Sequence, residues 1–115
     1  RFHLMNYPLG KGFISRHIDP IKYVNVTAGI YVTEYGKDYD SGGFYVINKK
    51  RKKINIDKKI KSSDMVLFYP SMPHGVDAIQ KKILKKPNIT DGRWFLNLTL
   101  VASHHVRNRI TSKGW

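Results

Sequence analysis

The chain of 115 residues contains no cysteine. This absence excludes disulfide frameworks, thiolate zinc sites and cysteine nucleophiles within the segment, and it suits the cytoplasmic location that we expect. Long apolar runs are also missing, since none approaches the roughly 18 residues that a membrane-spanning helix needs, and no signal-peptide pattern is present. Acidic residues are few, with eight Asp and Glu against 21 Lys and Arg. We therefore expect a globular, basic protein without a membrane partner.

The length predicts a single domain over residues 1–115 with one modest core. The chain starts with Arg1 and opens directly on an extended pattern, RFHLMNYP. We therefore expect this domain to be an excerpt of a longer polypeptide, with any helices lying outside it.

The net charge of +13 is concentrated in two segments. Residues 49–61, KKRKKINIDKKIK, carry eight of the 21 basic residues, and four more lysines lie between residues 81 and 86. Such clusters can bind a polyanion, or they can be a solvated hairpin tip and a lysine-rich loop. We favour the solvated segments over nucleic acid, because the clusters lack the interleaved aromatic residues of a single-strand platform. The positive charge is also compatible with an anionic substrate.

Alternation with a period of two dominates the chain and predicts strands. Residues 23–35, YVNVTAGIYVTEY, place aliphatic side chains on one face and polar groups with tyrosines on the other. Residues 93–103 alternate in the same way, and we expect Trp94 and Leu96 to belong to the core. A helical turn is predicted only at residues 79–85. Short strands separated by turns indicate an all-β sandwich or barrel.

The stretch GFISRHIDP holds a candidate metal site. His17 and Asp19 would project from the same face of a strand, because they are two positions apart. His74, 55 residues after Asp19, is the candidate third ligand. Two imidazoles and one carboxylate, with other positions left open, are the ligand set of non-haem Fe(II) oxygenases. Arg93 opens a strand, and its guanidinium could hold a carboxylate by two parallel hydrogen bonds.

The order HID, GG, SSDMVLFYPSMPHGVDAI and GRW resembles the 2-oxoglutarate and Fe(II)-dependent dioxygenase superfamily of prolyl-hydroxylase and phytanoyl type. The likeness runs from about Asn6 to Leu100. It implies a mainly β fold with a double-stranded β-helix (jelly-roll) core. It also implies an enzyme that uses dioxygen to couple oxidative decarboxylation of 2-oxoglutarate to hydroxylation of a substrate.

The resemblance assigns roles to single residues. It makes His17, Asp19 and His74 the Fe²⁺ ligands, Arg93 the partner of the distal carboxylate of 2-oxoglutarate, and Tyr7 a further contact of that co-substrate. Two features depart from the family. The 19-residue spacing from His74 to Arg93 is long, which we assign to an insertion, QKKILKKPNITD, and Phe95 stands where a serine is often found.

Other residues and functions complete these expectations. Tyr31 is expected to line the substrate pocket, whereas His3, His104 and His105 are expected to lie outside the site. One alternative function is a non-catalytic jelly-roll binding module whose basic hairpin, Lys49–Lys53, engages an anionic partner. Another is a cupin-like metal enzyme that uses no 2-oxo acid.

Overall fold

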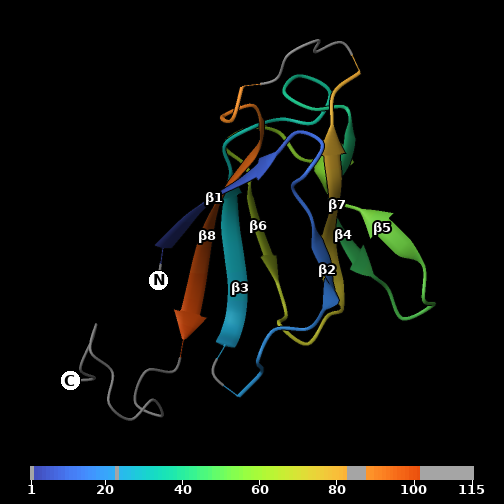
Figure 1. Cartoon of the computed structure of the whole chain (residues 1–115). Coiled ribbons are helices and arrows are strands. Elements are labelled where there is room, and N and C mark those ends of the chain that lie inside the picture. The colour runs from blue at the N-terminus through green and yellow to red at the C-terminus, as the bar shows by residue number, and fades with distance from the viewer. Residues whose placement is uncertain (1, 23, 83–87, 102–115) are drawn as a thin grey trace.

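The computed structural model describes residues 2–22, 24–82 and 88–101, which form two antiparallel four-stranded sheets (Figure 1). The first sheet has the order β1 (Phe2–Pro8), β8 (Gly92–Val101), β3 (Val24–Tyr31) and β6 (Met65–Phe68). The second has the order β2 (Ile14–His17), β7 (His74–Gln80), β4 (Ser41–Ile47) and β5 (Lys53–Asn55). A short 3₁₀ helix, η1 (Asp57–Lys59), follows β5. The prediction of a mainly β fold is confirmed.

The core lies between the two sheets. Tyr7 from the first sheet packs with Phe44, Val46, Val76 and Ile79 from the second. Phe44 and Phe68 meet across the sheets, with ring centroids 5.1 Å apart. Both sheets therefore bury one face, as a sandwich requires.

β8 buries the face opposite to the one predicted. Arg93 and Phe95 are buried, whereas Trp94 and Leu96 are only half-buried, so the prediction that the latter pair belongs to the core is wrong. Phe95 fits inside because Gly29 on β3 has no side chain, and a Cβ there would lie 1.9 Å from the ring. The outer face of this sheet is apolar and carries exposed Phe2, Leu4, Met65 and Leu67.

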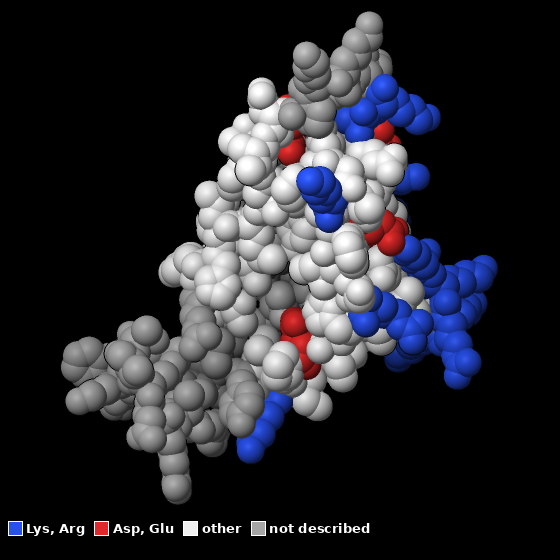
Figure 2. Space-filling model, viewed as in Figure 1, with Lys and Arg blue, Asp and Glu red and all other residues white. Residues whose placement is uncertain are grey.

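The basic segment at residues 49–52 forms the exposed turn between β4 and β5, where Figure 2 shows Lys and Arg side chains gathered. The turn is held by Asn48, whose Oδ1 accepts a hydrogen bond from the amide of Lys52 at 2.9 Å. The predicted order of strand, charged turn and strand is therefore confirmed.

β7 continues to Gln80, so the helical turn predicted for residues 79–85 is wrong at its start, and residues 83–87 lie outside the described part. Within the described ranges, no helix has the length and apolar character needed to span a bilayer.

Candidate metal centre and adjoining cavity

The three predicted metal ligands lie together. One potential ligand atom from each of His17, Asp19 and His74 falls within 4.8 Å of the others. His17 ends β2 and His74 begins β7, and the two residues are paired in register on adjacent strands. Asp19 Oδ1 lies 3.7 Å from Nε2 of His17 and 3.8 Å from Nε2 of His74. The fold thus brings Asp19 and His74, which are 55 positions apart in the sequence, into one cluster.

Asp19 reaches the cluster from a loop rather than from a strand, because β2 ends at His17. The expectation that both residues project from one strand is therefore wrong. The amide of Asp19 donates to the carbonyl of Pro70 at 2.9 Å, which fixes this loop beside β6. Thr27 Oγ1 donates to Asp19 Oδ2 at 2.7 Å and leaves Oδ1 facing the histidines. Thr27 could not be singled out from the sequence, since threonine is common in strands.

The tautomers of the two histidines favour a bound cation. Nδ1 of His17 lies 2.8 Å from the carbonyl of Ser15, and Nδ1 of His74 lies 2.8 Å from the carbonyl of Met72. A carbonyl can only accept, so both Nδ1 atoms carry a proton, and in the neutral ring Nε2 is then the nitrogen that presents a lone pair.

With both rings neutral, two imidazole lone pairs and one carboxylate oxygen converge. Burial lowers the pKa of His74 and keeps its ring neutral, despite the opposing effects of Met72 and Asp19. The donor set fits a divalent metal, because neutral imidazoles and a carboxylate bind such an ion directly.

A cavity of about 230 Å³ adjoins the three ligands. This volume is below the roughly 300–1,000 Å³ of pockets for drug-sized molecules, so the cavity suits a small ligand. Its lining includes the three ligands with Thr27, Tyr7, Arg93, Phe44, Phe68, Phe95 and Asn97. The ring of Phe68 lies 4.8 Å from that of His74, so the cavity wall beside the ligands is aromatic.

Tyr7 and Arg93, the two residues predicted to hold the co-substrate, both line this cavity. The Tyr7 hydroxyl has only the thioether of Met5 as a partner within the described residues, at 4.0 Å. Burial raises the pKa of Tyr7, so its hydroxyl keeps its proton as a donor. Because a thioether is a weak acceptor, this donor can serve a ligand in the cavity.

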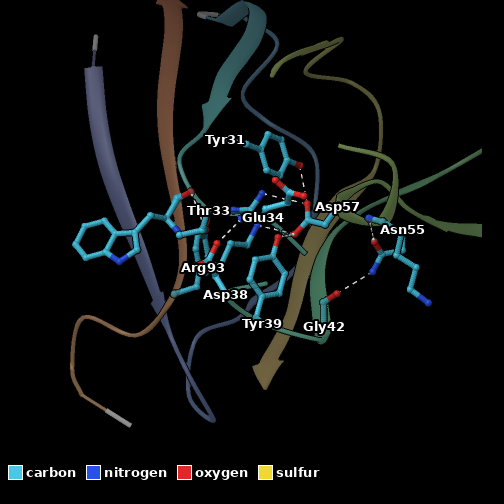
Figure 3. A network of polar contacts seen from close by, with 12 residues as sticks. Tyr31, Thr33, Glu34, Asp38, Tyr39, Gly42, Asn55, Asp57 and Arg93 are labelled. Atoms are coloured by element: carbon cyan, nitrogen blue, oxygen red, sulfur yellow. Dashed lines mark hydrogen bonds and ion pairs between the residues drawn. The ribbon is translucent and has the colours of Figure 1, made fainter. Parts of the chain in front are cut away.

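Arg93 is 1% exposed and already holds one carboxylate of the protein (Figure 3). Its Nε donates to Oδ2 of Asp57 at 2.7 Å and its Nη2 to Oδ1 at 3.3 Å. Burial alone would lower the pKa of Arg93, but the charge and the hydrogen bonds of Asp57, together with Tyr31 and Tyr39, outweigh burial and raise this pKa. The guanidinium is therefore charged inside the core.

Tyr31 and Tyr39 complete this cluster. Each hydroxyl donates to Asp57 at 2.6 Å, Tyr31 to Oδ1 and Tyr39 to Oδ2. Tyr31, which was expected to line the substrate pocket, does not border the cavity beside the ligands. The sequence did not identify Asp57 as a buried partner of Arg93, because Asp57 lies in a lysine-rich segment that is expected to be exposed to solvent.

The remaining histidines lie elsewhere. His3 is exposed on β1 and outside the metal cluster, as expected. His104 and His105 lie outside the described residues.

Comparisons with known proteins add no assignment. A scan against protein-family models gives no match, and a search of curated proteins gives none either. The chemistry of this site is therefore the basis for assigning a function.

Proposed function

We propose that this chain is the core of a non-haem, Fe(II)- and 2-oxoglutarate-dependent dioxygenase that hydroxylates a substrate. The observation that carries the proposal is the meeting of His17 Nε2, His74 Nε2 and Asp19 Oδ1 as three acceptors facing one point. Two imidazoles and one carboxylate, beside a cavity with further room, are the ligand set of such oxygenases.

We further propose that the two sheets form a double-stranded β-helix, or jelly roll. Eight strands in two facing sheets suit this fold. The chain passes between the sheets repeatedly, with β1, β3, β6 and β8 in one and β2, β4, β5 and β7 in the other. This alternation brings the ends of β2 and β7 beside the cavity between the sheets.

The protein's part in the reaction is positioning. Bound iron would supply the activation of dioxygen and of the 2-oxo acid. His17, Asp19 and His74 would hold the metal, and the hydroxyl of Thr27 donates a hydrogen bond to the second carboxylate oxygen of Asp19. A hydrogen bond from a neighbouring side chain to a ligating carboxylate orients that ligand.

At the same cavity, Arg93 and Tyr7 bind the distal carboxylate of 2-oxoglutarate. Arg93 supplies charge-assisted N–H donors, and Tyr7 supplies a hydroxyl that has no strong acceptor among the described residues.

An anionic substrate suits the surface next to this site. A hollow of about 880 Å³ is lined by Arg16, Lys49 and Arg51, together with Tyr69, Met72 and Pro73. Arg16 and Pro73 directly precede the ligands His17 and His74, so the hollow adjoins the metal centre. Within residues 2–22, 24–82 and 88–101, the three cations form no ion pair, and no acidic side chain lines the hollow. Such a surface attracts negative charge.

The test measures succinate released from 2-oxoglutarate in the presence of Fe(II) and dioxygen, without added substrate. We expect slow uncoupled release from the wild type and a loss of about 100-fold or more in His74→Ala, because removal of a ligand removes the metal. His3→Ala is the matched control and should keep wild-type release, since His3 is exposed and outside the cluster. Equal release from wild type and His74→Ala would refute the proposal.

A second variant separates the dioxygenase from a cupin-like metal enzyme. Arg93→Ala should abolish use of 2-oxoglutarate, because the cavity then offers no cation to the distal carboxylate. A metal-dependent activity that is indifferent to Arg93→Ala would instead favour an enzyme without a 2-oxo acid.

A further inference from the structure

Asp57 is fully buried, although it belongs to η1 beside the exposed Lys58 and Lys59. A carboxylate leaves water at high cost unless charged and polar groups compensate for the lost hydration. The fold makes room for it at Gly43 on β4, where a Cβ atom would lie 2.3 Å from Asp57 Oδ2. Gly43 has a φ of +97°, a backbone conformation that other residues rarely adopt. The carboxylate therefore occupies a place built for it.

Four hydrogen bonds satisfy the two oxygens of Asp57 (Figure 3). Each oxygen accepts one bond from a tyrosine, Tyr31 or Tyr39, and one from the guanidinium of Arg93. A carboxylate offers about four lone-pair sites, so it has no free acceptor left for a ligand. Asp57 thus faces inward on Arg93 and the tyrosines, and it does not line the cavity.

Arg93 connects this cluster to the cavity. Of the four residues, it is the one that lines the cavity beside the metal ligands. Two of the five N–H groups of its guanidinium donate to Asp57, and the guanidinium also interacts with the side chain of Tyr31, which leaves further N–H groups for a ligand. The rings of Tyr7, Tyr31 and Phe95 lie within 5.2 Å of its guanidinium carbon and restrict its movement.

We propose that Asp57 is a positioning residue, which fixes the guanidinium of Arg93 so that its unused N–H groups point to the distal carboxylate of 2-oxoglutarate. This inference rests on the proposed function and adds a residue to it. Asp57 holds Arg93 by its Nε edge, so the co-substrate meets a guanidinium of fixed position. A guanidinium binds a carboxylate more tightly when its orientation is already fixed before binding.

The test compares Asp57→Asn with wild type in two measurements. The first is KM and kcat for 2-oxoglutarate, from succinate release. We expect KM to rise about ten- to hundredfold, because misplacement of a binding group by about 1 Å can have such an effect, while kcat at saturating 2-oxoglutarate changes little. The second is the inhibition constant of 2-oxobutanoate, which has the same chelating end but no distal carboxylate. It should stay at the wild-type value.

A KM that stays unchanged or falls in Asp57→Asn would overturn the inference, as would an equal rise in KM and in the 2-oxobutanoate inhibition constant. If Asp57→Asn does not fold, Tyr39→Phe replaces it, since Tyr39 donates to Asp57 and lies outside the cavity. We expect its KM to rise about two- to tenfold with the inhibition constant unchanged, and an unchanged KM would again overturn the inference. A wild type that releases no succinate would refute the dioxygenase, whereas an active wild type with an insensitive Asp57→Asn refutes only the role of Asp57.

Discussion

His17 and His74 are paired in register across β2 and β7, and their ring centroids lie 4.4 Å apart. Because each Nδ1 donates to a backbone carbonyl, the rings turn their Nε2 lone pairs to the carboxylate of Asp19. The carboxylate and the two lone pairs together make an electron-rich site, which a cation would stabilise.

The first prediction is that a divalent metal stabilises the folded protein. A ligand that binds only the native state adds about 2.7 kcal/mol to the free energy of unfolding at a concentration 100 times its Kd. We expect Fe(II), or Co(II) as an air-stable substitute, to raise the Tm of wild type measured by scanning calorimetry, and a chelator to reverse the rise. His17→Ala should show no rise, whereas the control His3→Ala should behave as wild type. A metal-independent Tm in the wild type would contradict the prediction.

The second prediction concerns Thr27, whose hydroxyl holds Oδ2 of Asp19. Thr27→Val keeps the shape of the side chain but removes the donor, and metal affinity should fall about 10- to 100-fold, as is usual for such outer-shell partners. Metal titration by calorimetry measures the change. Thr33→Val is the control, because Thr33 accepts from the amide of Trp94 away from the ligands. It should lower stability without changing metal affinity, and equal metal affinities of wild type and Thr27→Val would exclude this role.

The third prediction concerns Tyr7. Loss of its hydroxyl in Tyr7→Phe should raise KM for 2-oxoglutarate about two- to tenfold, the equivalent of one hydrogen bond. Stability should change little, because among the residues that the structure describes the hydroxyl has only the weakly accepting thioether of Met5 as a hydrogen-bond partner, at 4.0 Å. Tyr35→Phe is the contrasting variant. Its hydroxyl donates to the carbonyl of Asp40, so we expect lower stability and an unchanged KM. Denaturant titration and steady-state kinetics distinguish the two.

The fourth prediction tests the basic hollow near the metal centre. The double variant Arg16→Glu/Arg51→Glu reverses two of its cations, and it should elute from a heparin column at clearly lower salt than wild type. Lys11→Glu/Lys59→Glu changes the net charge equally, at exposed residues that do not line the hollow. We expect a smaller shift for this control. Equal shifts would show that net charge alone decides the retention.

Alternation is a local signal, so it allowed the strands to be predicted, and the H-x-D pattern with the family resemblance allowed His17, Asp19 and His74 to be predicted as one cluster. Alternation did not show which face of β8 is buried, since a period of two is the same for both faces. Trp94 and Leu96 were placed in the core for their apolar character, but the inner face carries Arg93 as part of the site.

Asp57 was not predictable from local pattern. Its neighbours in sequence are exposed lysines, whereas its partners Tyr31, Tyr39 and Arg93 come from segments 18 to 36 residues away. Burial of a carboxylate depends on those distant donors, and one sequence does not show which segments meet. The same reason explains why Asp19 was assigned to a strand although it lies in a loop held by Pro70.

The fifth prediction follows from the space that Gly43 leaves for Asp57. Gly43→Ala places a Cβ atom 2.3 Å from Asp57 Oδ2 at a φ of +97°. Left-handed backbone costs a non-glycine residue about 1–2 kcal/mol, and overpacking adds about 1–3 kcal/mol. Gly36→Ala is the matched control, because Gly36 has a φ of +88° but open space around its Cβ position. We expect the free energy of unfolding of Gly36→Ala, measured by urea titration, to fall only by the cost of the left-handed backbone. The difference between the two variants isolates the contact with Asp57, and equal losses would mean that the carboxylate moves aside without cost.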